Sequence, residues 1–96
     1  MTEIPELTAA QLSRAIPARA HRRLMEGRIE SGEDVAMLRR FVAMTQSQFA
    51  RAMGISVHTL RNWEQGRRSP EGPAMALLRI AATHPRIIRE SLQTAA

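Results

Sequence analysis

Two short helices joined by a tight glycine turn are predicted between Thr45 and Gly66, and this unit constrains the fold most strongly. The run 45–48, Thr-Gln-Ser-Gln, is a capping box, in which Thr and Gln side chains satisfy backbone N–H groups at a helix start. Gly54 can adopt the left-handed conformation that ends a helix at low cost. Ser56 can cap a second helix that runs to Gly66. Two helices therefore meet across a turn.

The residue types within this unit are those that a helix-turn-helix requires. Its inward positions carry apolar side chains: Phe49, Met53, Ile55, Leu60 and Trp63. A side chain larger than Ala50 would push the helices apart, and a β-carbon at Gly54 would strain the turn. Because Trp63 shares the helical phase of Leu60, its pattern favours a core position over a base-stacking platform.

The flanking sequence predicts further helices within a body that spans residues 32–96. A first helix is expected after the cap signal at Ser31 and through Met44. Its apolar residues recur at helical spacing: Val35, Leu38, Phe41 and Val42. Pro73 and Pro85 can each open a later helix, since proline is tolerated in the first turn. The body is therefore expected to contain five helices, and the fold class is all-α.

An N-terminal arm, residues 1–31, precedes this body and is the less readable part of the chain. A short helix is predicted between Pro17 and Gly27. The low density of apolar residues favours a partly ordered arm with little to bury. Two interpretations stay open: a loosely ordered lead-in, or an arm with a binding function of its own.

Positive charge is concentrated in the body. All 14 basic residues are Arg, and residues 36–96 contain nine of them against three acidic residues, whereas residues 1–35 contain five against six. Arg grips phosphate and guanine in bidentate fashion, which suits a nucleic-acid partner. Codon usage in a GC-rich genome produces the same bias, so composition alone supports only a preference for polyanions.

The run TQSQFARAMGISVHTLRNWEQGRRSP resembles the DNA-binding core of the Cro-like, lambda-repressor-like regulators of the XRE family. The resemblance covers about residues 33–82. The longer phrase TLRNWEQGRRSPEGPAMALLRIAATHP is similar to HigA-type antitoxins, which are encoded beside RelE-like toxins. The resemblance thus implies a five-helix lambda-repressor-like domain and a sequence-specific repressor.

The resemblance also implies roles for individual residues. The helix after Ser56 would enter the major groove of double-stranded DNA. Expected base-reading residues are Val57, His58, Thr59, Arg61 and Asn62. Expected phosphate contacts are Thr45, Gln46, Ser56, Arg67 and Arg68. Arg39 and Glu64 are expected to form a structural ion pair between two helices.

The last predicted helix indicates that the chain associates with a second subunit. Its apolar residues, Ile87, Ile88 and Leu92, are more than a terminal helix of so small a domain can bury within one chain. They therefore predict a homodimer that binds an inverted-repeat operator. The antitoxin resemblance adds a RelE/HigB-like toxin as a partner, for which the acidic-leaning arm is the predicted site. A stand-alone regulator without a toxin, or an adaptor that uses the same fold to hold proteins, are the alternatives.

Several classes of function are not expected. The sequence contains no cysteine, no phosphate-binding glycine loop, no paired carboxylates at a plausible site and no nucleophile elbow, so we expect no enzyme and no cofactor. His21, His58 and His84 are far apart without ligands at metal spacing, which argues against a metal site. The first residues lack a secretory signal and no run is long enough to cross a bilayer, so a cytoplasmic location is expected.

Overall fold

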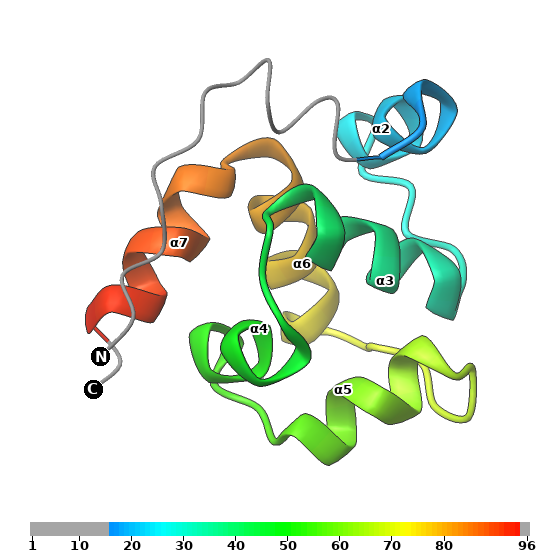
Figure 1. Cartoon of the computed structure of the whole chain (residues 1–96). Helices are drawn as coiled ribbons and strands as arrows, with labels where there is room; N and C mark the ends of the chain where they lie inside the picture. Colours follow the sequence, from blue (N-terminus) through cyan, green and yellow to red (C-terminus); the bar gives the residue numbers. More distant parts are fainter. Residues whose placement is uncertain (1–15, 95–96) are drawn as a thin grey trace.

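The computed structural model describes residues 16–94 of the 96-residue chain, and all secondary structure in this part is helical. The helices are α2 (Ala18–Met25), α3 (Gly32–Phe41), α4 (Gln46–Met53), α5 (Val57–Glu64), α6 (Pro73–Thr83) and α7 (Pro85–Thr94) (Figure 1). The all-α class is confirmed. The described residues contain six helices: five, α3 to α7, lie in the predicted body, and α2 lies where a short helix is predicted between Pro17 and Gly27.

Local caps place both ends of α4 and the start of α5 where the sequence predicts them. The Thr45 hydroxyl accepts a hydrogen bond from the Gln48 N–H at 3.1 Å, and the Gln48 side chain accepts one from the Thr45 N–H at 2.9 Å. Ser56 caps α5 by accepting from the Thr59 N–H at 3.0 Å. Gly54 ends α4 in the left-handed conformation, with φ of 73°. These caps fix both ends of the turn between α4 and α5.

The end of α3 differs from the prediction, which extended this helix through Met44. The helix ends at Phe41, and Ala43 has a φ of 59°. The Met44 N–H donates to the Arg39 carbonyl at 3.2 Å and the Ala43 N–H to the Arg40 carbonyl at 3.0 Å, which is the Schellman arrangement that glycine usually completes. By reversing the chain here, Ala43 lets Val42 and Met44 both reach the core, where they are 0% and 4% exposed.

Helix α2 belongs to the same core as the body. It packs against α3 and α6. Four apolar residues of this segment are buried in the core: Ile16, Ala20, Leu24 and Ile29. The expectation that the arm has little to bury is therefore wrong for residues 16–31. Residues 1–15 of the predicted arm lie outside the described residues, and the division of the chain before Gly32 stays a prediction.

An ion pair ties α2 to the start of α3. The Arg23 guanidinium donates to the Asp34 carboxylate at 2.5 Å, and the Glu30 N–H donates to the other oxygen at 2.9 Å. Burial raises the pKa of Asp34, but the hydrogen bonds from the Glu30 backbone and the Arg23 side chain outweigh burial and leave this pKa below its usual value. Asp34 is therefore held as a carboxylate against α2.

Helix α7 completes the core of its own chain, which corrects part of the expected dimer surface. It packs against α4 and α6, and the Arg89 guanidinium donates to the Val42 carbonyl at 2.6 Å. Ile88 is only 8% exposed within the core, and Leu92 packs against the core. Two of the three residues predicted to contact a partner subunit therefore pack within their own chain, whereas Ile87 is 54% exposed. Sequence reasoning missed this because it underestimated how much of α7 lies on α4.

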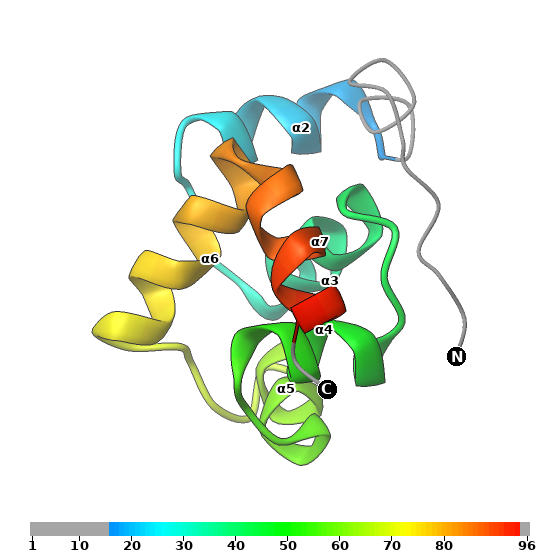
Figure 2. The same ribbon diagram turned by 90° about the vertical axis from the view of Figure 1, so that its left-hand side faces the viewer.

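The first turn of α3 lies directly on the last turn of α5. A β-carbon on Gly32 would lie 2.3 Å from the Trp63 carbonyl oxygen and 2.6 Å from that of Glu64. Both are backbone atoms, which cannot move aside as a flexible side chain does. Glycine at this position therefore sets how closely α5 approaches α3. Helices α4 and α5 occupy one end of the molecule and α2 the opposite end (Figures 1 and 2).

We expect Gly32→Ala to destabilise the protein by about 1 to 3 kcal/mol, because the added methyl group overpacks the junction of α3 and α5. Chemical denaturation followed by circular dichroism measures the change. Glu33→Ala, an exposed change in the same turn, is the control and should cost less than about 1 kcal/mol. Equal stability of Gly32→Ala and the unchanged protein would show that this contact does not set the packing.

Candidate nucleic-acid interface

Helix α5 presents polar side chains on the face away from the core. Its apolar residues Leu60 and Trp63 are buried, as the helical phase of Trp63 predicts. His58 and Arg61 are exposed, and Asn62 is half-buried. The Asn62 amide and the His58 Nε2 lie 3.3 Å apart, one helical turn from each other. The structure therefore brings three of the five predicted base-reading residues to one exposed face.

The other two predicted base-reading residues are partly engaged elsewhere. Val57 is half-buried and packs against the core. The Thr59 hydroxyl accepts a hydrogen bond from the Ser56 hydroxyl at 3.0 Å. Val57 therefore offers only its remaining methyl surface to a ligand, which suits contact with a thymine methyl group, whereas Thr59 keeps its methyl group and its own O–H donor.

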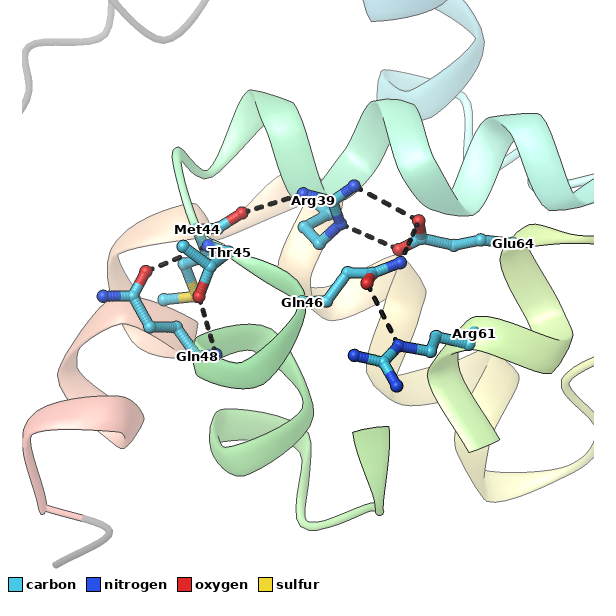
Figure 3. A network of polar contacts seen from close by, with 7 residues as sticks. All are labelled: Arg39, Met44, Thr45, Gln46, Gln48, Arg61 and Glu64. Carbon is cyan, nitrogen blue, oxygen red and sulfur yellow. Dashed lines mark hydrogen bonds and ion pairs between the residues drawn. The ribbon is translucent and has the colours of Figure 1, made fainter. Parts of the chain in front are cut away.

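A chain of polar contacts links α3, α4 and α5 (Figure 3). Arg39 binds Glu64 through two parallel bonds, Nε to Oε2 at 2.8 Å and Nη2 to Oε1 at 3.2 Å. Gln46 donates from Nε2 to Glu64 Oε1 at 3.1 Å and accepts from Arg61 Nε at 3.3 Å. The structure thus contains the ion pair that the resemblance implies, and the pair continues through Gln46 to Arg61.

The ion pair is largely removed from water. The side chain of Arg39 is 17% exposed and that of Glu64 is 8% exposed. Arg39 also donates from Nη1 to the Met44 carbonyl at 3.2 Å, so the same guanidinium holds the turn that precedes α4. Bidentate geometry and an additional acceptor are the conditions under which a half-buried ion pair is stable. The pair therefore fixes α5 and the start of α4 against α3.

The predicted phosphate contacts divide into two groups. Thr45 and Ser56 serve as helix caps. Arg67 and Arg68 are exposed in the turn after α5, where both backbone N–H groups donate to the Asn62 carbonyl, at 2.9 and 3.3 Å. The backbone of this turn is therefore held to α5, while its two guanidinium groups extend into solvent. Two cations beside a polar helix face suit a polyanionic ligand.

Sequence reasoning missed the contact of Gln46 with Arg61. These residues are 15 positions apart and lie on different helices. Neither helix periodicity nor a capping pattern relates them, because their contact depends on the angle at which α5 crosses α4. The Arg39–Glu64 pair could be predicted only from the resemblance to a family.

Two other kinds of site have no candidate in the part of the chain that the structure describes. Within residues 16–94, no group of three His, Cys, Asp or Glu side chains is placed to hold a metal ion. No described helix has the length and apolar character to cross a membrane.

Comparison with known proteins agrees with this arrangement. The helix-turn-helix family model matches residues 35–78, from α3 into α6. Residues 35–78 of the chain are thus similar to a helix-turn-helix domain. Antitoxin HigA-2 of Vibrio cholerae serotype O1 is 40% identical to the chain over 55 residues, which are 57% of this chain and 53% of that protein. The chain thus matches about half the length of this relative. No solved structure matches the chain.

These findings confirm the resemblance drawn from the sequence. The matched residues of the helix-turn-helix domain include both helices of the turn and the Arg39–Glu64 pair. They also include the exposed face of α5. The polar face and its supporting ion pair therefore lie within the part of the chain that the family shares.

We expect Glu64→Ala to destabilise the helix-turn-helix domain by about 2 to 4 kcal/mol, because Arg39 would stay largely buried without its partner. The melting temperature and the midpoint of denaturation measure this loss. Glu71→Ala removes an exposed carboxylate from the loop before α6 and is the matched control. An unchanged melting temperature for Glu64→Ala would contradict a structural role of the pair.

Proposed function

We propose that this protein is a sequence-specific DNA-binding repressor and not an enzyme. One observation carries the proposal: the exposed face of α5 holds His58, Arg61 and Asn62 within a helix-turn-helix domain. A helix of this kind fits the major groove, where side chains distinguish all four base pairs. Side chains already oriented by hydrogen bonds lose little freedom on binding.

The exposed residues of this surface suit two different tasks. Asn62 can bond the edge of adenine, and His58 and Arg61 can donate to guanine. Arg67 and Arg68 extend from the following turn and can bind the phosphate backbone, which supplies affinity without sequence information. We propose phosphate contacts for Thr45 and Ser56 as well, limited to the hydrogen-bonding capacity that their capping roles leave.

We further propose that the protein is an antitoxin that represses its own operon and neutralises a RelE/HigB-like toxin in the cytoplasm. The similarity to antitoxin HigA-2 supports this, together with the antitoxin-like sequence from α5 through α6. A toxin-binding surface must lie away from α5 if DNA and toxin bind together. Helix α2 lies at the opposite end of the molecule (Figure 2). The arm is therefore still the proposed toxin site.

A homodimer is part of this proposal, with a revised surface. Large apolar side chains exposed on α6 and α7 are Leu77, Ile80 and Ile87. A two-fold pair of chains would present two α5 helices to an inverted-repeat operator. These exposed apolar residues on consecutive helices support such a contact better than Ile88 and Leu92, which pack in or against the core of their own chain.

Base reading and phosphate binding have different thermodynamic signatures. Asn62→Ala is expected to cost about 1 to 3 kcal/mol on a duplex that the protein selects from a randomised library, and little on a scrambled duplex. Arg67→Ala is expected to weaken both duplexes alike and to lower the slope of log affinity against log salt by about 0.9. Fluorescence anisotropy titrations at several salt concentrations measure both.

The converse pattern contradicts the placement of α5. If Asn62→Ala weakened both duplexes equally, or if Arg67→Ala changed the preferred sequence at an unaltered salt slope, the exposed face of α5 would not lie in the major groove. Failure of the unchanged protein to select any sequence would contradict the proposal that it is a sequence-specific repressor.

The antitoxin proposal predicts a stable complex with the product of the adjacent gene. Co-expression and sedimentation are expected to give a complex that contains two copies of this chain. Removing residues 1–15, which deletes none of the core residues described, should weaken toxin binding and spare DNA binding. Full neutralisation by the truncated protein would move the toxin site to residues 16–94, and absence of any complex would favour a stand-alone regulator.

A further inference from the structure

Gln46 stands at the first position of α4, where the family resemblance implies a phosphate contact. The structure gives its side chain two other partners. Its Nε2 donates to Glu64 Oε1 at 3.1 Å, and its Oε1 accepts from Arg61 Nε at 3.3 Å. One amide thus connects a carboxylate to a guanidinium through its oxygen and one of its two N–H groups.

The charges of these partners determine which way the amide points. The NH₂ group of Gln46 faces an anion, Glu64, and its carbonyl oxygen faces a cation, Arg61. The flipped amide would place oxygen against the carboxylate and N–H groups against the guanidinium, which has no acceptor. Glu64 is in turn fixed by Arg39 through two bonds. The orientation of Gln46 therefore follows from the ion pair behind it.

This arrangement leaves one edge of Arg61 for a ligand. Its Nε bonds to Gln46, and no other residue described in the structure hydrogen-bonds to its guanidinium. In Figure 3 no dashed line reaches either terminal nitrogen of Arg61. Two terminal nitrogens in a plane match the O6 and N7 acceptors of guanine. Because Nε is held, the guanidinium offers its terminal pair as a fork of fixed direction.

We propose that Gln46 is a positioning residue that aims Arg61 at a guanine edge, rather than a phosphate contact. This inference rests on the proposed DNA-binding function. Only the second N–H of the Gln46 amide is left for a phosphate, and the bonds to Glu64 and Arg61 fix the direction of that N–H. The relay from Arg39 through Glu64 and Gln46 instead sets the specificity of Arg61.

The test is a double-mutant cycle on DNA. The probes are a duplex selected by the unchanged protein from a randomised library and a scrambled duplex of the same composition. The variants are Gln46→Ala, Arg61→Ala and the double variant, and Gln93→Ala, an exposed Gln-to-Ala change on α7, is the control. Circular dichroism melting checks that each variant folds, and Gln46→Met, of similar length without hydrogen bonds, replaces Gln46→Ala if that variant does not fold.

We expect Gln46→Ala to weaken binding to the selected duplex about tenfold, with little effect on the scrambled duplex and an unchanged salt slope. The double variant should bind like Arg61→Ala alone, because a positioning residue has no effect once the residue it positions is absent. Repeating the selection with Gln46→Ala should relax the preference at the same base pair that Arg61→Ala relaxes.

Three results overturn the assignment. Equal weakening on both duplexes with a salt slope lowered by about 0.9 would make Gln46 a phosphate contact. Additive losses in the double variant would show that Gln46 acts independently of Arg61. An unchanged base preference in the repeated selection would remove the specificity role. Failure of the unchanged protein to select any sequence contradicts the proposed function itself, which is a different outcome from these three.

Discussion

The bidentate pair of Arg39 and Glu64 is the interaction on which the arrangement of the DNA-facing helices depends. It joins α3 to the last turn of α5, next to the place where Gly32 lets the two backbones meet. Arg39 also holds the Met44 carbonyl, so the same side chain fixes the entry to α4. Replacing one partner would leave the other charge largely buried and would destabilise the fold. The stability that the pair adds over two apolar residues is smaller than this loss. The pair therefore specifies a geometry more than it adds stability.

Signals contained in a few neighbouring residues predicted the helix starts well. Thr45 and Ser56 cap their helices as expected, and Pro73 opens α6. These features depend on hydrogen bonds within one turn, so the sequence is sufficient to find them. The end of α3 was missed because Ala43 takes a left-handed conformation that its residue type does not signal. Burial of Val42 and Met44 on either side of it compensates for the strain, and that burial depends on the whole core.

Features that depend on how the helices cross were not readable in the same way. Ile88 looked available for a partner, yet α7 lies on α4 and buries it. The arm was expected to have little to bury, yet α2 packs against α3 and α6 and Leu24 is buried. The contact of Gln46 with Arg61 arises from two helices whose relative rotation no local pattern encodes. For the candidate site, the sequence predicted which residues occupy α5, and the fold determined which of their atoms are already engaged.

Hydrogen bonds between surface side chains and the ion pair behind them explain how so small a domain can hold polar side chains in defined directions. Two polar side chains on the outer face of α5 have partners: Asn62 lies against His58 one turn away, and Arg61 bonds to Gln46 and through it to the ion pair. Ordering these side chains is therefore part of folding, so less conformational entropy is lost when a ligand binds. Arg67 and Arg68, with exposed side chains, retain that freedom and suit phosphates, whose positions vary little with sequence. The ordered side chains of α5 therefore suit recognition of a base sequence, whereas the freer side chains of Arg67 and Arg68 suit a general attraction to DNA.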